Sequence, residues 1–513
     1  MRHRFFPSIL VAAVLLAPRL AFAAATCASP AIHPAGDWPM LNGPVTGTRH
    51  QPAESTIGPG DVSKLVPKWT FSVASGGGSG VFQSTATVAG GCVYAGTSAG
   101  WVFALNADDG NLVWKAHGPV APAPAAPGPG VPIGGGGVFA VAVDDGRAIA
   151  GFSPVGAQTE RYARAFDRLT GETLWTAGPL GDGAGEGATI TASPVVFDGM
   201  VWVSMATETS PESRVPYYLL SAATGSILHK GYAIPEKDLA YGYGGGGIWS
   251  TPAVDVEAGY LYAGTSDSET YVKQHRHNNA ILKIDVNPAR TATFGKVVDA
   301  YKGNVDTYVP GTDRTPVCKQ LGNDVGRLFR GGEYSPACGE IDIDFGASIN
   351  LFVDEEGDQV VTAMQKSCVF HAVTADTLTQ KWTAIHSHPD EIGCLSTAAV
   401  GDGKIFASAD QPGTVWGMTT IGYPLWVQSN AVIASVPPLT YANGVVYAAD
   451  HLGLVAWDAK TGVPLLYRPF AADVGEFCGV TAGGVSVARN TVYVECDYGL
   501  TGGGWIVAYS LPR

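Results

Sequence analysis

The chain has 513 residues, of which 46% are apolar and only 15% are charged, and it contains 67 glycines and 34 prolines. Globular proteins carry about 25% charged residues, and glycine and proline interrupt helices, so the composition excludes a disordered or fibrous chain and predicts a large, turn-rich β protein. The formal net charge of −14 disfavours nucleic acid or an anionic lipid surface as a partner.

Residues 1–23 are predicted to be a secretory signal peptide. Two arginines among the first four residues precede a largely apolar run over residues 5–16, and residues 21–23 (AFA) have the small-x-small pattern of a cleavage site. We therefore expect a mature chain that starts near Ala24 and is periplasmic or secreted. No other stretch approaches the roughly 18 apolar residues that span a bilayer, so no membrane insertion is expected.

Residues 24–513 contain eight copies of one repeat. The clearest copy, residues 84–114, has alternating strands separated by Gly and Asp turns and ends in Trp. Each copy is predicted to form about four short antiparallel strands, and a lone sheet of this kind cannot bury both faces. Radial stacking buries them, which predicts a single all-β domain, an eight-bladed β-propeller of four-stranded antiparallel blades. The eighth copy lacks its last strand, and residues 65–73 are predicted to close the ring by supplying it.

Two further features bear on packing and function. Tryptophans end the last strand of several copies and are predicted to be packing anchors between blades: Trp69, Trp114, Trp175, Trp382 and Trp426. Extra residues at 268–280 and 298–343 predict loops on the faces of the ring, where function is usually carried.

The eight cysteines all follow the predicted leader, so disulfides are expected. Cys318 with Cys338, and Cys478 with Cys496, are the predicted pairs because each brackets a turn-rich insertion. The remaining four are not assigned: Cys27, Cys92, Cys368 and Cys394.

Several stretches resemble a known family. The repeat A-x-D-x-x-T-G-x-x-x-W at 165–175, and an opening DWPMLNG with Arg49 and Trp69 downstream, resemble the eight-bladed quinoproteins that bind pyrroloquinoline quinone (PQQ). The stretches IWSTPAVD, IDFGASINLF and MQKSCVFHAV are most similar to the polyvinyl-alcohol-dehydrogenase-like branch. The resemblance implies a periplasmic alcohol dehydrogenase that uses PQQ with Ca²⁺, or less readily a lanthanide, on a secondary or polymeric alcohol.

The expected electron path follows from a missing motif. The sequence has no C-x-x-C-H, so no covalent haem is expected, and electrons would pass to a separate acceptor such as a periplasmic cytochrome c. It also has no adjacent Cys-Cys pair, so the vicinal disulfide that covers the quinone in several alcohol dehydrogenases is not expected.

The resemblance also implies four cofactor-binding residues. Trp249 matches the aromatic floor beneath the quinone, and Thr191 matches a hydroxyl that hydrogen-bonds the cofactor. Lys366 matches a cationic side chain near the quinone oxygens. Gln83 stands where the family often has a Glu that faces the cofactor.

The implied metal ligands are Glu208 and Asp267. Asp267 stands where the family usually has Asn, and a carboxylate remains a hard oxygen donor. Asp344, before an inner strand, matches the general base. In the other register, Asp342 would be the base and Asp344 an additional metal ligand, and we favour Asp344.

A second function is kept open. The departures at Asp267 and Gln83 would suit a propeller that has lost its cofactor and serves as a binding or assembly scaffold in the cell envelope. The paired histidines at 275/277 and 386/388 have metal-like spacing, but no further ligand pattern accompanies them, so zinc is not expected.

Overall fold

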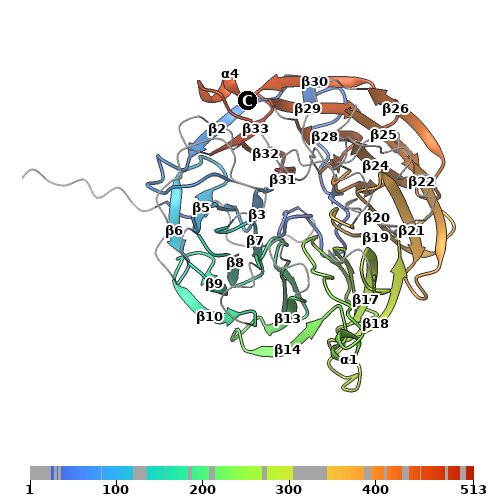
Figure 1. Ribbon diagram of the computed structural model, residues 1–513. Helices are drawn as coiled ribbons and strands as arrows, with labels where there is room; N and C mark the ends of the chain where they lie inside the picture. Colours follow the sequence, from blue (N-terminus) through green and yellow to red (C-terminus); the bar gives the residue numbers. More distant parts are fainter. Residues whose placement is uncertain are drawn as a thin grey trace, which may run out of the picture.

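Eight small antiparallel sheets are arranged as a ring in the computed structural model (Figure 1). This confirms the predicted eight-bladed propeller. The structure describes residues 25–27, 32, 36–82, 84–119, 136–155, 158–182, 188–206, 214–267, 274–303, 344–385, 394–409, 413–429, 438–450, 452–479, 483–496 and 504–512.

The blades are numbered here from the first complete sheet. Blade 1 comprises β3 (Thr87–Ala89), β4 (Cys92–Gly96), β5 (Trp101–Asn106) and β6 (Leu112–His117), and blade 2 comprises β7 (Val141–Val143), β8 (Arg147–Phe152), β9 (Arg161–Asp167) and β10 (Thr173–Leu180). Blade 3 comprises β11 (Val195–Phe197), β12 (Met200–Ser204), β13 (Pro216–Ser221) and β14 (Ile227–Tyr232), and blade 4 comprises β15 (Ala253–Asp255), β16 (Tyr260–Gly264), β17 (Ala280–Asp285) and β18 (Val297–Lys302). Blade 5 comprises β19 (Asn350–Val353), β20 (Gln359–Met364), β21 (Val369–Thr374) and β22 (Gln380–Ile385), and blade 6 comprises β23 (Ala399–Gly401), β24 (Lys404–Ala409), β25 (Thr414–Thr419) and β26 (Pro424–Ser429). Blade 7 comprises β27 (Thr440–Ala442), β28 (Val445–Ala449), β29 (Gly453–Asp458) and β30 (Pro464–Pro469), and blade 8 comprises β31 (Val485–Ala488), β32 (Thr491–Cys496), β33 (Trp505–Ser510) and β2 (Val66–Ser72). The short helices are η1 (Val62–Lys64), α1 (Glu236–Leu239) and α4 (Ala471–Val474).

The ring is closed by the predicted N-terminal strand. β2 pairs antiparallel with β33, from Val66 opposite Ser510 to Ser72 opposite Trp505, and completes blade 8. The preceding strand, β1 (His50–Gln51), pairs parallel with β27 and makes blade 7 five-stranded. This pairing ties the N-terminal segment to the last blade, and Trp69 and Phe71 of β2 pack with Phe103 of blade 1 in one buried cluster.

The predicted tryptophan anchors hold neighbouring blades together. Trp114 of blade 1 donates its indole N–H to the Arg168 carbonyl of blade 2 at 2.9 Å, and its ring lies against Gly171. Gly171 has φ +76, and a Cβ there would lie 2.7 Å from the Trp114 ring, so the contact requires glycine. The same ring-on-glycine contact joins Trp69 to Gly110, Trp175 to Gly225, Trp382 to Gly422 and Trp426 to Gly462.

The axis of the ring is crossed by residues 38–51, which we call the plug (blue, near the centre of Figure 1). Arg49 in the plug is fully buried and donates to the carbonyls of Leu41, Leu439 and Val485. Burial lowers the pKa of Arg49 to about 9. The plug bonds to the inner strands of seven blades: Trp38 with Val88, Pro39 with Val143, Val45 with Val254, Thr46 with Leu351, Thr48 with Val400, Arg49 with Tyr441 and Gln51 with Val487.

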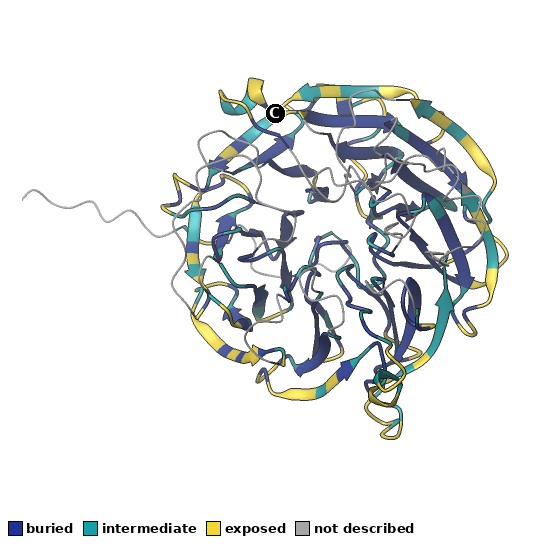
Figure 2. Cartoon of the chain, in the orientation of Figure 1, coloured by how far each residue is buried: buried dark blue, intermediate teal, exposed yellow. Residues whose placement is uncertain are grey.

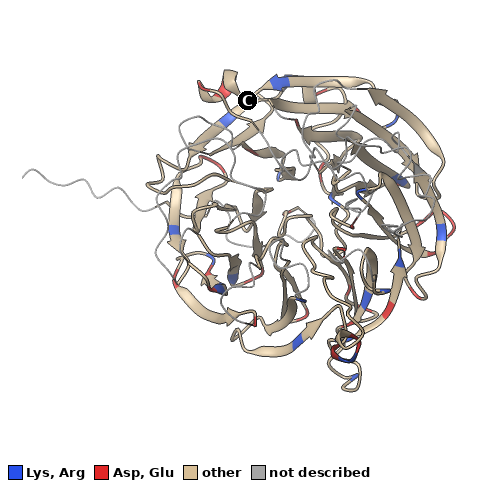
Figure 3. Cartoon of the chain, in the orientation of Figure 1, with Lys and Arg blue, Asp and Glu red and all other residues tan. Residues whose placement is uncertain are grey.

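Burial increases from the outside of the ring to the inside (Figure 2). Inner and second strands such as β3 and β4 are buried along their whole length, whereas an outer strand such as β14 has mostly exposed and half-buried residues. Lys and Arg residues occur on several outer strands (Figure 3), for example Lys230 on β14 and Lys381 on β22. Charged groups near the axis therefore stand out from the general pattern.

Three disulfides lie in the described part of the chain. Cys478–Cys496 confirms its prediction, and the unassigned cysteines pair as Cys27–Cys92 and Cys368–Cys394. Cys318 and Cys338, most of the predicted loop 298–343, and residues 268–273 of the other predicted loop lie outside the described residues. Among the described residues, no helix has the length and hydropathy to cross a membrane.

Candidate active site

Three of the predicted site residues come together at the junction of blades 4 and 5. Trp249 precedes β15, Asp344 precedes β19, and Lys366 lies in the turn after β20. Because β19 and β20 are antiparallel, the start of one lies beside the end of the other. We call this end of the ring, where inner strands begin and second strands end, the site rim.

Direct contacts link the three side chains. The Trp249 indole N–H donates to Asp344 Oδ2 at 2.8 Å, and Lys366 Nζ lies 3.0 Å from Asp344 Oδ1. The same ammonium is 4.9 Å from the centroid of the Trp249 ring, a cation–π distance. The arrangement places one carboxylate between an N–H donor and a cation, against an aromatic ring.

Burial makes this cluster costly unless its charges are paired. Asp344 is 3% exposed and Lys366 is 6% exposed. An isolated buried charge is strongly disfavoured, and the ion pair between these two residues contributes charge compensation to both. Removing one partner therefore takes away charge compensation from the other.

The backbone fixes where the carboxylate lies. Lys366 N–H donates to the Asp344 carbonyl at 3.0 Å, and Phe345 N–H donates to the Thr265 carbonyl of blade 4 at 3.2 Å. Gly346 then runs beneath the Trp249 ring, since a Cβ at this position would lie 2.3 Å from Trp249 Cη2. Asp344 is thus held to both blades by main-chain bonds before its side chain makes any contact.

The other predicted residues on the rim are Thr191 and Asp267. Thr191 precedes β11, and its buried Oγ1 has no hydrogen-bond partner in the described part of the chain. Asp267 is buried after β16, and its carbonyl accepts N–H groups from Gly246 and Asn278. Gln83, Glu208 and the alternative base Asp342 lie outside the described residues.

These features fit a planar, polar cofactor with an associated metal. Trp249 is only partly buried, unlike the packing residues Trp114 and Trp175, so part of its ring is available to a ligand. The unpartnered Thr191 hydroxyl and the Lys366 ammonium can hydrogen-bond acceptor atoms. Asp267 and its neighbouring carbonyls are oxygen donors of the kind that Ca²⁺ binds.

A polar network behind Lys366 was not predicted from the sequence. Gln365 Oε1 accepts from Ser367 Oγ at 3.1 Å and lies 3.0 Å from His371 Nε2, while His371 Nδ1 lies 3.0 Å from the Tyr301 hydroxyl. Burial lowers the pKa of His371 to about 4, so the imidazole is neutral at pH 7. His371 lies inside a β-strand pattern, where nothing in one sequence separates it from a surface residue.

Glu495 at the end of β32 was also missed. It is 2% exposed, and its Oε2 accepts the Ser84 N–H at 3.0 Å, next to predicted residue 83. The equivalent positions of blades 1, 3 and 4 are Gly96, Ser204 and Gly264. A carboxylate where other copies of the repeat have a small residue is the feature of the sequence that could have indicated Glu495.

Two other groups of side chains are structural. His275 Nε2 lies 3.2 Å from Asp238 Oδ2, and His277 Nδ1 lies 2.6 Å from the Ala233 carbonyl, so each ring has a protein partner. Asp354, Glu356 and Asp358 form the group with metal-ligand spacing among the described residues. Lys381 Nζ lies 2.6, 3.0 and 2.5 Å from these three carboxylates in turn, so its ammonium group compensates part of their negative charge.

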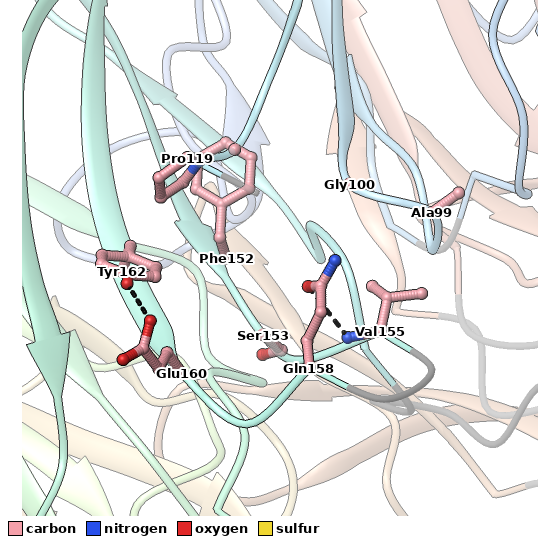
Figure 4. A pocket seen from close by; sticks show the side chains of 10 residues that line it. Ala99, Gly100, Pro119, Phe152, Ser153, Val155, Gln158, Glu160 and Tyr162 are labelled. Atoms are coloured by element: carbon pink, nitrogen blue, oxygen red, sulfur yellow. Dashed lines mark hydrogen bonds between the residues drawn. The ribbon is translucent and has the colours of Figure 1, made fainter. Parts of the chain in front are cut away.

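A separate hollow lies between blades 1 and 2 (Figure 4). The Tyr162 hydroxyl donates to Glu160, and the Val155 N–H donates to Gln158 Oε1 at 3.3 Å. The hydrogen bond to Glu160, with burial, raises the pKa of Tyr162. Of the predicted site residues that the structure describes, none lines this hollow.

The fold and parts of the sequence are similar to those of known dehydrogenases. Residues 38–128 match the family model described as "Glucose/ethanol/alcohol dehydrogenase, beta-propeller domain". The quinohemoprotein alcohol dehydrogenase ADHIIG of Pseudomonas putida HK5 is 14% identical with a TM-score of 0.68, covering 93% of this chain and 80% of that one. A europium-containing methanol dehydrogenase is 15% identical with a TM-score of 0.66, covering 93% of this chain and 98% of that one.

A relative with a more specific name matches by sequence. The chain is 23% identical to a polyvinylalcohol dehydrogenase of Pseudomonas sp., over 90% of this chain and 73% of that protein. The resemblance predicted from the sequence motifs is therefore confirmed.

Proposed function

We propose that this protein is a PQQ-dependent alcohol dehydrogenase that acts on secondary or polymeric alcohols. The observation that carries the proposal is the buried Asp344 carboxylate, held between the Trp249 indole and the Lys366 ammonium on the site rim. The similarity to a polyvinylalcohol dehydrogenase supports the choice of substrate. PQQ, with Ca²⁺ or a lanthanide ion beside it, would supply the two-electron acceptor and the Lewis acid when bound.

Each residue has a distinct task in this proposal. Asp344 accepts the hydroxyl proton of the alcohol as general base, since it is the carboxylate that contacts both Trp249 and Lys366. Trp249 orients the carboxylate through its N–H and offers its ring as the floor of the site. Lys366 and Thr191 donate hydrogen bonds to cofactor oxygens, while Asp267 and Glu208 hold the metal.

The wider setting of the reaction is part of the same proposal. With no C-x-x-C-H in the chain, electrons leave to a separate acceptor such as a periplasmic cytochrome c. The leader pattern of residues 1–23 supports export to the periplasm, and the expected domain is the single propeller of residues 24–513.

Reconstitution tests the proposal. The purified protein is titrated with PQQ in the presence of Ca²⁺ or, separately, of a lanthanide ion, and cofactor binding is followed by quenching of Trp fluorescence. We expect saturable binding, followed by dye reduction that depends on propan-2-ol or polyvinyl alcohol. Absence of PQQ binding with either metal would overturn the proposal and would favour the envelope scaffold instead.

A further inference from the structure

The turn that carries Lys366 is held at both of its ends. It joins β20 to β21, and the Cys368 N–H donates to the Gln365 carbonyl at 2.8 Å to close it. Lys366 itself is bonded through its N–H to the Asp344 carbonyl. Cys368 has φ +60, in the left-handed region that few non-glycine residues adopt, so this backbone needs support from outside the turn.

That support includes a covalent bond to the next blade. The Cys368–Cys394 disulfide joins the Lys366 turn to the segment that leads into β23 of blade 6, and both cysteines are 1% exposed. It is packed among Ala347, Met364 and Phe370, which lie in the same buried cluster. The bond therefore fixes a point two residues from Lys366 to a different blade.

The other end of the disulfide also reaches the site. Leu395 follows Cys394, and a Cβ on Gly346 would lie 2.4 Å from Leu395 Cδ2 as well as 2.3 Å from Trp249 Cη2. The Leu395 side chain and the Trp249 ring thus meet over Gly346. Two residues later, Thr397 Oγ1 accepts the Ser348 N–H at 3.0 Å, so this segment runs alongside the chain that follows Asp344.

We propose that the Cys368–Cys394 disulfide is a positioning element of the candidate active site. One end holds the Lys366 turn, and the other holds Leu395 against Gly346 and Trp249. The bond therefore keeps Trp249, Asp344 and Lys366 in their relative positions. The inference rests on the proposed function, because it assigns the disulfide a role in binding PQQ and in turnover. The cysteines touch no reacting atom and act only through Lys366, Leu395 and Trp249.

The test compares two double variants of the full-length protein. Cys368→Ala/Cys394→Ala removes the proposed positioning bond, and Cys27→Ala/Cys92→Ala removes a disulfide from blade 1 as the matched control. The first readout is hydrogen exchange of the peptides covering residues 344–370 without cofactor. We expect faster exchange at the backbone amides of positions 366 and 368 in the first variant, by about tenfold or more, and wild-type rates in the control.

The second readout separates positioning from general stability. We expect the first variant to weaken PQQ binding and lower kcat, each by about tenfold or more, because small displacements of reacting groups are costly. The control should lose thermal stability and keep both values. Wild-type exchange rates together with wild-type PQQ affinity in Cys368→Ala/Cys394→Ala would overturn the inference.

A gentler variant covers the case in which the first does not fold. Leu395→Ala leaves the disulfide intact and removes its contact with Gly346 and Trp249. We expect a weaker PQQ affinity and altered Trp fluorescence without cofactor, and unchanged values of both would overturn the inference. If the wild-type protein bound no PQQ, the proposed function would fail, whereas the exchange and fluorescence data would still decide whether the disulfide orders the cluster.

Discussion

The blade junctions of this ring differ in the side chains that join neighbouring blades. At most junctions a tryptophan from one blade packs on a glycine of the next, as Trp114 does on Gly171. At the junction of blades 4 and 5, Asp299 stands where the tryptophan is expected and Leu378 where the glycine is expected. Lys283 takes over the contact, donating to the carbonyls of Ala375 and Asp376 at 2.9 and 2.6 Å.

At the junction of blades 4 and 5 the two changes are linked. A tryptophan would clash with the side chain of Leu378, so loss of the ring and loss of the glycine belong together. The Lys283 ammonium is instead covered by the Tyr260 ring, 4.1 Å from its centroid. The junction that uses Lys283 is also the one that carries Trp249, Asp344 and Lys366, so the site lies where the tryptophan–glycine contact is replaced.

The largest expected effect is a loss of turnover when Asp344, at the junction of blades 4 and 5, is replaced. Asp344→Asn keeps the shape and the bond from the Trp249 indole but removes the base, so kcat should fall by about 10² to 10⁴-fold while PQQ binding persists. Steady-state kinetics with a reconstituted sample measures this. Asp299→Asn, at an exposed carboxylate of the same junction, is the control that should keep wild-type kcat. An active Asp344→Asn beside an inactive Asp342→Asn would assign the base to Asp342.

A change at a junction with the tryptophan–glycine contact should lower the stability of the fold and leave the catalytic step unchanged. Trp175→Ala removes a buried ring packed on Gly225 and a 2.8 Å bond to the Ala222 carbonyl. The free energy of unfolding should drop by about 3–5 kcal/mol, as for other buried aromatic truncations. Denaturant unfolding gives this value. A large loss of PQQ affinity in the folded variant would contradict the division between packing junctions and the site junction.

Low pH is expected to destabilise blades 4 and 5, which carry the candidate site. Burial lowers the pKa of His277 and His371, in blades 4 and 5, to about 4, against about 6.5 when unfolded. Below pH 6.5 the unfolded chain binds more protons, so stability should fall as pH drops toward 4, by up to about 1.4 kcal/mol per pH unit for each histidine. His371→Gln should flatten this slope in unfolding measurements across that range. An unchanged slope would show that His371 does not contribute.

The smallest expected effect tests the substitute contact. Lys283→Met keeps most of the side-chain volume but leaves the Ala375 and Asp376 carbonyls without the Lys283 ammonium as donor. We expect a loss of about 1–3 kcal/mol in unfolding free energy. Lys230→Met on the outer strand of blade 3, where the ammonium is more exposed, serves as the comparison and should cost less. Equal losses would mean that the Lys283 contact is not specific to its junction.

Local pattern explains which of these features could be predicted. Strand alternation, turn glycines and the strand-ending tryptophans repeat along the chain, so the ring, its closure by β2 and the anchors follow from sequence. Asp344, Trp249 and Lys366 came from a resemblance, and the structure brings them into contact. Cys368–Cys394 could not be predicted, because it joins different blades and brackets no insertion of its own. Lys283 was hidden for a related reason, since a lone lysine gives no sign of which carbonyls it will meet.

The plug has a consequence for how the chain folds. Residues 38–51 lie near the start of the chain, yet they bond to Val487 and to the inner strands of blades 1, 2 and 4 to 7. Contacts this far apart in sequence form slowly and late. A chain synthesised from its N-terminus must therefore hold this segment and β2 unpaired until the last blade is available. Exposed edges during that wait favour aggregation, so we expect refolding yield to depend more strongly on protein concentration than on the stability of any single blade.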